Sequence, residues 1–363
     1  MKRLAPLLLG WILSGPVITQ AEPVSLVFVG DIMLDDGPGK LVAGGGDPLE
    51  SFAATLQDAD FAIGNLECPV ASIGEPIANK IFTFRADPSV LRVLRGRFAG
   101  LSVANNHSGD YGKDAFVETL GRLEAAGLPY FGGGRNLAEA HKPLWLEKNG
   151  LRIALLAYNE FKPRSFEAGA DWPGIAWSED MDVVADIRAA RGAGADLVIP
   201  LMHWGWEHER QPSERQRQLA RLMIDAGADA VIGSHPHVTQ GADHYRGRPI
   251  VYSLGNFVFD GFESPAARQG WVLRLTVDKT GVVAWETLAA QIDAGGSPHP
   301  VPGMATPCGW AGEAEPRAPQ LPQSRRQVRR PRSITSRPLL FVHWIKLARS
   351  FCQSLQPRRR PIG

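Results

Sequence analysis

The chain has 363 residues, of which 44% are hydrophobic and 21% are charged, and its formal net charge is +1. This composition is typical of a folded protein with a sizeable core, and it excludes a wholly disordered or fibrous chain. The near-zero charge hides an asymmetry, because residues 316–363 carry 12 of the 39 basic residues and no acidic residue. The rest of the chain is therefore acidic, which argues against a nucleic-acid partner.

The first 21 residues have the three zones of a secretory signal peptide. Lys2 and Arg3 precede an apolar run at residues 4–18, and the small residue Ala21 ends the segment. The run is shorter than the roughly 20 residues that span a bilayer, which favours cleavage over a retained anchor. We therefore predict a signal peptide at residues 1–21 and an exported protein, periplasmic or at the cell surface.

Residues 22–293 are predicted to form one domain in which strands and helices alternate. Strands are expected at residues 24–29, 61–63, 98–104, 151–158, 197–202, 230–232, 249–254, 271–277 and 282–288. Helices are expected at residues 47–57, 87–95, 113–126 and 213–226, with Asp47 and Asp87 as N-caps of the first two. Alternation of this kind predicts a layered α/β fold.

Residues 294–363 change character, because Pro, Gly, Ser, Gln and Arg dominate and regular periodicity is lost. Such a composition predicts a disordered tail. Two alternatives stay open. Residues 339–355 could form a short basic amphipathic helix that lies on an anionic membrane surface. Frame-shifted translation past the end of the domain would also give an abrupt break of this kind.

Seven side chains that can bind metals or transfer protons directly follow apolar strands. Each has an ordinary explanation when taken alone, such as a turn-forming Asp or a hydrogen-bonded His. Because α/β sheets bind their ligands at the carboxyl ends of strands, the seven together indicate one shared site. They are Asp31, Glu67, Asn106, His107, His203, His235 and His237.

The mixture of carboxylate, amide and imidazole groups indicates which cations would fit. Mn²⁺, Fe²⁺ and Zn²⁺ accept such ligands, and a thiolate site is excluded because only Cys68 lies near these positions. His235 and His237 flank Pro236, whose stiff ring could direct the two imidazoles toward different ions. One or two divalent ions are therefore expected, and a pair could activate water and bind the oxygens of a phosphoryl group.

Six short motifs occur in this order: Gly30-Asp31, Gly64-Asn65-Leu66-Glu67, Asn105-Asn106-His107, Met202-His203-Trp204-Gly205, Gly233-Ser234-His235-Pro236-His237 and Tyr252-Ser253-Leu254-Gly255-Asn256-Phe257. Together they resemble the capsule synthesis protein CapA family, also called the poly-γ-glutamate synthesis family, of the calcineurin-like metallophosphoesterase superfamily. The resemblance covers about residues 24–290. It implies a four-layer α/β/β/α sandwich with a two-metal site at strand ends.

The resemblance also implies individual roles. Asp31 and His237 resemble ligands of the first metal, and Glu67 resembles the bridging carboxylate. The second-metal ligands would be Asn106, His203 and His235, and the general acid would be His107. Two positions depart from the superfamily pattern: Met33 stands where a His is usual, and Asn65 with Glu67 replaces the usual bridging Asp.

Further polar residues are candidates for supporting roles. Arg85 could bind an anionic substrate bidentately or be an ordinary surface residue beside a helix start. Asp110 could orient His107 or form a turn before Gly112. Three other residues are expected to orient metal ligands from behind. They are Asn105, Glu207 and Asn256.

Three functions remain in competition at this stage. The first is a metal-dependent hydrolase or phosphoesterase that acts on an anionic polymer or a phosphorylated substrate of the cell envelope. The second is a non-catalytic accessory subunit that binds polymer within a capsule synthesis complex. The third is a protein whose basic tail contacts the membrane surface. We predict the first, within capsule or poly-γ-glutamate synthesis.

Overall fold

The computed structural model describes residues 22–162 and 164–310. The predicted signal peptide at residues 1–21 and the possible helix at residues 339–355 lie outside these ranges. None of the helices in the described ranges combines the length and the apolar character needed to cross a bilayer.

The first sheet is built around parallel strands from the N-terminal third of the chain. Its order is β16-β15-β14-β1-β2-β3-β4, with β13 beside β1 and β17 beside β15. The strands are β1 (Val24–Ile32), β2 (Phe61–Leu66), β3 (Gly100–Ser102), β4 (Tyr130–Phe131), β13 (Asn256–Val258), β14 (Gln269–Asp278), β15 (Gly281–Ile292), β16 (Pro298–Pro300) and β17 (Cys308–Trp310). Strands β1 to β4 run parallel, whereas β14 pairs antiparallel with β1.

The second sheet has the order β11-β12-β10-β9-β7-β6. Its strands are β6 (Leu144–Lys148), β7 (Leu151–Asn159), β9 (Leu197–His203), β10 (Val231–Ser234), β11 (Ala242–Tyr245) and β12 (Arg248–Val251). The inner strands β7, β9, β10 and β12 are parallel. A separate two-stranded ribbon joins β5 (Gly133–Gly134) to β8 (Gly174–Ile175).

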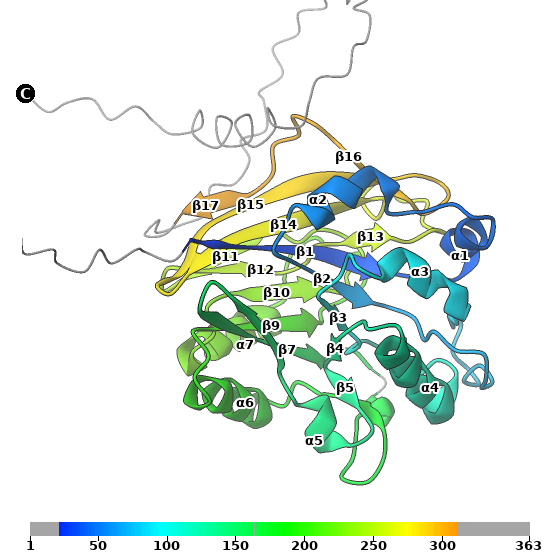
Figure 1. Ribbon diagram of the computed structural model, residues 1–363, viewed down its shortest axis with the longest axis horizontal. Helices are drawn as coiled ribbons and strands as arrows, with labels where there is room; N and C mark the ends of the chain where they lie inside the picture. The colour runs from blue at the N-terminus through cyan, green and yellow to red at the C-terminus, as the bar shows by residue number, and fades with distance from the viewer. Residues whose placement is uncertain (1–21, 163, 311–363) are drawn as a thin grey trace, which may run out of the picture.

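Helices cover the outer faces of both sheets (Figure 1). The first sheet is covered by α1 (Asp36–Ala43), α2 (Ala53–Gln57), α3 (Leu91–Leu94) and α4 (Gly112–Ala125), and the second by α6 (Asp180–Gly192) and α7 (Glu214–Ala226). The remaining helical segments are α5 (Leu137–Ala140) and the 3-10 turns Glu50–Phe52, Pro88–Val90 and Arg164–Phe166.

Three apolar layers hold these elements together. Within β1, Val27 and Val29 pack under the helices, whereas Leu26 and Phe28 pack between the two sheets. A third layer lies between the second sheet and α6 and α7. Burial on both faces explains why β1 is a continuous apolar run. This arrangement confirms the predicted four-layer α/β/β/α sandwich.

The predicted boundary between the folded domain and the tail, at residue 294, is too early. Strands β16 and β17 both pair antiparallel with β15, so the folded domain reaches at least Trp310. Strand β16 was not predicted because it contains Pro298 and Pro300. Proline has no N–H group to donate, so a segment with two prolines does not have the pattern of a strand. Helix α6 was also missed, since Val183, Ile187 and Ala190 are its only buried residues.

A buried carboxylate joins α6 to the second sheet and provides a test of the fold. Asp229, 2% exposed, forms ion pairs with Arg191 and Arg248 and accepts a hydrogen bond from the Val198 N–H at 2.9 Å. We expect Asp229→Ala to lower the free energy of unfolding by about 3–5 kcal/mol, because two partly buried guanidinium groups lose their partner.

Chemical denaturation of both variants measures this effect. Asp225→Ala is the matched control, since Asp225 lies in α7 and pairs at the surface with Arg246. Its loss should change the free energy of unfolding by at most about 1 kcal/mol. Equal effects of the two substitutions would contradict the structural role of Asp229.

Candidate metal centre

The candidate site lies where the carboxyl ends of the parallel strands of both sheets meet. The arrowheads of β1, β2, β9 and β10 point to the same side of the molecule in Figure 1. Asp31 lies near the end of β1, Glu67 directly follows β2, and His203 ends β9. Gly30, directly before Asp31, allows close approach of the backbone, because a Cβ atom there would lie 1.8 Å from the Gly255 carbonyl oxygen.

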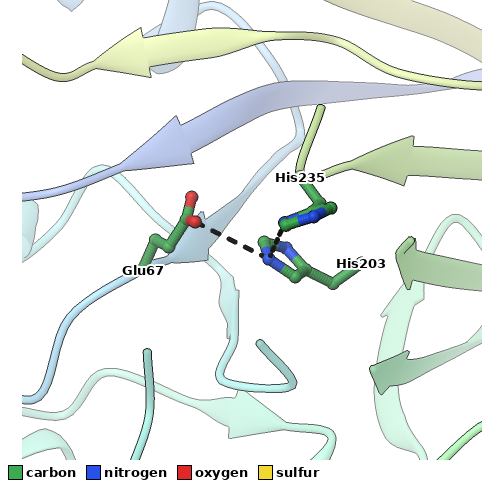
Figure 2. A group of neighbouring side chains, drawn as sticks. All are labelled: Glu67, His203 and His235. Atoms are coloured by element: carbon green, nitrogen blue, oxygen red, sulfur yellow. Dashed lines mark hydrogen bonds and ion pairs between the residues drawn. The ribbon is translucent and has the colours of Figure 1, made fainter. Parts of the chain in front are cut away.

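One group of ligand atoms converges on His203. Its Nε2 atom lies 2.6 Å from Asn106 Oδ1, 3.1 Å from His235 Nδ1 and 3.6 Å from Glu67 Oε1. Figure 2 shows the carboxylate and the two imidazoles pointing toward one another. All four side chains are buried. Two ring nitrogens 3.1 Å apart can share either a proton or a cation, and the nearby oxygens favour a cation.

A second group lies beside the first and shares Glu67 with it. Ligand atoms of Asp31, Glu67 and His237 all lie within 4.8 Å of one another. His237 Nδ1 is 3.5 Å from Asp31 Oδ2, and His237 Nε2 is 3.9 Å from Glu67 Oε1. Glu67 therefore faces both groups, which is the placement that a bridging carboxylate requires.

The backbone between the two groups is unusual. His235 has a φ of 96° and His237 a φ of 57°, and both values lie in a region that non-glycine residues rarely adopt. Pro236 stands between them. The two imidazole centroids are 5.9 Å apart with planes at 53°, so the turn directs one ring to each group. Such strain is concentrated at functional sites.

Unpartnered polar atoms show that the residues fit a cation. Three buried atoms lack a hydrogen-bond partner within residues 22–162 and 164–310. They are the two carboxylate oxygens of Glu67 and the Nε2 atom of His235. Buried polar atoms of folded proteins almost always have partners. A divalent cation would supply the missing interaction for the carboxylate, and the donor set suits Mn²⁺, Fe²⁺ or Zn²⁺.

The electrostatics of the metal-free site agree with this conclusion. Burial, followed by the charge of Asp31, raises the pKa of Glu67 well above its usual value. Burial and the neighbouring imidazoles lower the pKa values of His203 and His235 well below 6.5. Burial also lowers the pKa of His237, but the hydrogen bond and charge of Asp31 outweigh it and raise the value overall. The lowered pKa values favour the neutral forms of His203 and His235, and neutral imidazole is the form that binds metals.

His107 stands next to the first group with its own carboxylate partner. Its Nδ1 atom lies 2.7 Å from Asp110 Oδ2, and Asp110 also accepts a hydrogen bond from the Phe84 N–H at 2.8 Å. Burial lowers the pKa of His107 despite the opposing effect of Asp110. Asp110 thus lies within hydrogen-bond distance of the imidazole, where it could orient the ring.

Lys80 is a functional candidate that the sequence did not reveal. Its Nζ atom forms an ion pair with Asp110, donates to the Asn106 carbonyl at 2.8 Å and lies 3.3 Å from His107 Nδ1. It comes from an irregular segment without a motif, so only the tertiary structure brings it to the site.

The predicted supporting residues lie behind the ligands. Asn65 donates to Asp31 Oδ1 at 2.8 Å, and Asn105 donates to Asn65 Oδ1 at 3.1 Å. Asn256 Oδ1 lies 2.8 Å from His237 Nδ1. These amides hold the side chains of Asp31 and His237 in place, in the way that outer hydrogen bonds commonly support a metal site.

Two other predicted positions have different surroundings. Arg85 donates to the carbonyls of Ile73 and Gly74 and lies 4.3 Å from the centroid of the Tyr111 ring, so its guanidinium braces a loop. Met33 is buried in the apolar layer under the helices, and its Sδ atom accepts a hydrogen bond from the Asp35 N–H. Met33 therefore adds no ligand to the group of Asp31, Glu67 and His237.

Aromatic rings surround the imidazoles. The ring centroid of Phe161 lies 3.9 Å from that of His235, and that of Phe84 lies 4.6 Å from that of His107. The ring centroid of Phe262 likewise lies 5.0 Å from that of His237. Trp206, which contacts Phe161, is 66% exposed, so apolar surface continues outward from the site.

Several known proteins are similar to this chain. Residues 25–261 match the family described as bacterial capsule synthesis protein PGA_cap. The chain is 36% identical to the PGA biosynthesis protein CapA of Bacillus subtilis, over 69% of this chain and 65% of that protein. It is 34% identical to the capsule biosynthesis protein CapA of Bacillus anthracis, over 69% of this chain and 61% of that protein.

A more distant relative and a solved structure complete the comparison. The chain is 31% identical to a Mycobacterium tuberculosis protein named as a polyglutamine synthesis accessory protein, over 59% of this chain and 60% of that protein. The NAD nucleotidase of Haemophilus influenzae is similar with a TM-score of 0.44 and 13% identity, over 78% of this chain and 54% of that one. The chain thus spans less than two thirds of the length of these curated relatives.

Proposed function

Because the chain belongs to the bacterial capsule synthesis protein PGA_cap family, we propose that it acts in the synthesis of a capsule or of poly-γ-glutamate. Within that process we propose a metal-dependent hydrolase of the phosphoester type. The signal-peptide pattern of residues 1–21 supports a site of action outside the cytoplasm.

The observation that carries the proposal is the buried Glu67 carboxylate, which faces two ligand groups and has no hydrogen-bond partner within the described parts of the chain. Asp31, Glu67 and His237 would hold one cation, and Asn106, His203 and His235 would share Glu67 to hold another. Bound divalent cations polarise a phosphoryl oxygen and lower the pKa of bound water.

The remaining polar residues would handle the leaving group. His107 would donate its proton to the leaving oxygen as general acid, while Asp110 holds the ring through Nδ1. Lys80 lies beside the same atoms and would attract an anionic substrate. Each of these tasks is a proton transfer or an electrostatic contact that the present side-chain positions allow.

The surroundings of the site favour a particular class of substrate. An exposed Trp206 and the ring of Phe161 offer apolar surface next to the imidazoles. Ile81 and Phe82, which directly follow Lys80, are 89% and 68% exposed. These exposed apolar side chains support, as the substrate, a phosphoester that carries an apolar group, such as a lipid-linked envelope precursor.

A non-catalytic accessory role is the second candidate. The name of the Mycobacterium tuberculosis relative describes an accessory protein. Met33 also leaves the group of Asp31, Glu67 and His237 with fewer ligands than the superfamily pattern has. In that case the metal-bearing site would bind anionic polymer, within a synthesis complex or at the membrane surface, without cleaving it.

Metal analysis and a substrate panel distinguish the two candidates. We expect purified protein to contain Mn, Fe or Zn and to hydrolyse a lipid phosphoester faster than a small hydrophilic one, with both activities lost after chelation and restored by metal. Polymer binding without turnover of any ester would favour the accessory role. A wild-type protein without metal affinity would contradict the site assignment altogether.

A further inference from the structure

Exposed apolar side chains gather in one loop between β2 and α3, at residues 72–85, which is named the apolar loop below. Of the ten large apolar side chains that are exposed in the described parts of the chain, four lie in this loop. They are Ile73, Ile77, Ile81 and Phe82, which are 49%, 39%, 89% and 68% exposed. A cluster of this kind on a folded protein marks a surface that contacts another apolar body.

Hydrogen bonds hold the apolar loop in shape. Near its start, the Ile73 N–H donates to a carboxylate oxygen of Glu118 in α4 at 3.1 Å. At its end, the Arg85 guanidinium donates to the Gly74 carbonyl at 2.8 Å and so ties the two arms of the loop together. The exposed apolar side chains therefore belong to an anchored loop, which presents them in a fixed arrangement.

A turn in the middle of the loop separates an inward-facing cation from the outward-facing apolar residues. Asn79 has a φ of 65°, which reverses the chain direction at this point. Lys80 then reaches inward, and its Nζ atom forms an ion pair with Asp110 beside the candidate metal centre. Ile81 and Phe82 follow directly and are exposed. The most exposed apolar part of the loop thus borders the metal centre.

The degree of exposure distinguishes between two kinds of apolar partner. A side chain that lines a groove for a single acyl chain loses much of its surface to the walls of that groove. Ile81 keeps 89% of its surface, so it projects from the protein and does not line a groove. A projecting apolar side chain suits a bilayer, which receives such side chains at the boundary between headgroups and acyl chains.

The charge of the loop is also compatible with a membrane. The domain as a whole is acidic, yet residues 72–85 contain Glu75 as their one acidic residue and Lys80 and Arg85 as basic residues. Anionic lipid headgroups attract basic segments and repel acidic ones. The apolar loop can therefore approach an anionic bilayer with less repulsion than the acidic surface elsewhere.

We propose that the apolar loop docks the protein on a lipid bilayer, with Ile81 and Phe82 inserted at the boundary between headgroups and acyl chains. Because Lys80 of the same loop reaches the metal centre, docking would place that centre beside the membrane surface, where the phosphate of a lipid lies. The choice of a lipid phosphoester rests on the proposed function. The docking surface adds that this substrate is taken from the bilayer and not from solution.

A fluorescent label on the loop tests insertion directly. Ile81→Cys in the full chain is labelled with the environment-sensitive nitrobenzoxadiazole group and mixed with vesicles of phosphatidylcholine and phosphatidylglycerol. We expect the emission to shift to the blue, and lipids that carry a quencher on the acyl chain should quench it. Met181→Cys, at an 82% exposed position of α6, is the matched control and should show neither change. Wild type treated with the same label gives the background from its own cysteines.

Removal of the two side chains should weaken vesicle binding. The double substitution of Ile81→Ser with Phe82→Ser should lower the partition of the protein onto these vesicles at least about tenfold, because both apolar groups lose their burial in the bilayer. The measurement is made in about 1 M salt, where the Debye length is about 3 Å and the basic residues 316–363 no longer attract the headgroups. Met181→Ser should bind like wild type, and matching denaturation curves exclude a folding defect.

Several results would overturn the inference. One is a label at Ile81 that does not respond to vesicles, whether or not the protein binds them. Another is equal partition of wild type and the double variant. A blue shift that appears without vesicles as the protein concentration rises would show that a second copy of the chain covers the loop. Each of these results leaves the proposed function intact, since both assays need neither metal nor turnover. Absence of metal affinity would contradict the proposed function and leave these assays unaffected.

Discussion

Glu67→Gln should abolish metal binding and hydrolysis and, at the same time, stabilise the metal-free protein. The Glu67 carboxylate is fully buried, faces Asp31 and has no hydrogen-bond partner among the described residues. A neutral amide removes the charge that both cations need, and activity should fall at least about 10²–10³-fold. It also removes a buried, repelled charge, which should raise the free energy of unfolding by about 1–3 kcal/mol.

The stabilisation should depend on pH in a defined direction. Burial and Asp31 raise the pKa of Glu67 in the folded metal-free protein, so the folded state holds this proton more tightly than the unfolded chain does. Wild-type stability should therefore fall as pH rises from the unfolded pKa, about 4.3, toward the raised folded value. The advantage of Glu67→Gln should grow over the same range.

Denaturation in the presence of a chelator, at a series of pH values, measures both effects. Glu75→Gln, a substitution at an exposed loop residue, should leave metal content, activity and stability unchanged. A Glu67→Gln protein that keeps its metal, or whose metal-free form is less stable than wild type, would show that Glu67 is an ordinary structural residue.

His107→Ala should slow hydrolysis about 10²–10⁴-fold for an alkyl phosphoester, because the leaving alkoxide then departs without a proton. The effect on a 4-nitrophenyl ester should be less than about tenfold, since nitrophenolate is a good leaving group without protonation. Metal content should not change, because the ligand groups do not include His107. Elemental analysis and steady-state kinetics with both esters measure these three results.

Asp110→Asn gives the matched comparison. It preserves the shape beside His107 but weakens the contact at Nδ1, and it should produce a smaller loss with the same dependence on the leaving group. If His107→Ala slowed both esters equally, the residue would act in binding or folding and not as a general acid.

The strand-end residues could be predicted because they obey short-range rules. Asp31, Glu67, His203 and His235 each follow an apolar run, and parallel strands bring such positions to one edge. Burial on both faces also made β1 easy to identify. Each of these patterns involves only a few neighbouring residues. The layered fold could be predicted because apolar strands and helices alternate repeatedly along the chain.

Other parts of the site depend on contacts between distant segments. Lys80 and Phe161 reach the imidazoles from loops with no periodic pattern or motif. Glu207 was expected to orient a ligand from behind, whereas its carboxylate lies within 4.8 Å of a ring nitrogen of His237, a distance that its sequence position does not show. Strand β16 contains two prolines and forms only because β15 offers a partner. Sequence patterns indicate the local conformational preference of a segment. These features instead depend on contacts between segments that are distant in the sequence.

The ligand groups draw on both sheets, since Asp31, Glu67 and Asn106 come from the first while His203 and His235 come from the second. A bound cation is then a cross-link between the two sheets, in addition to the apolar layer and the direct contacts that already join them, such as the ion pair of Lys148 with Asp60. Binding energy adds directly to the stability of the whole domain, by an amount set by free metal concentration. The lifetime of the folded protein would thus follow the supply of metal in its surroundings, independently of any reaction it catalyses.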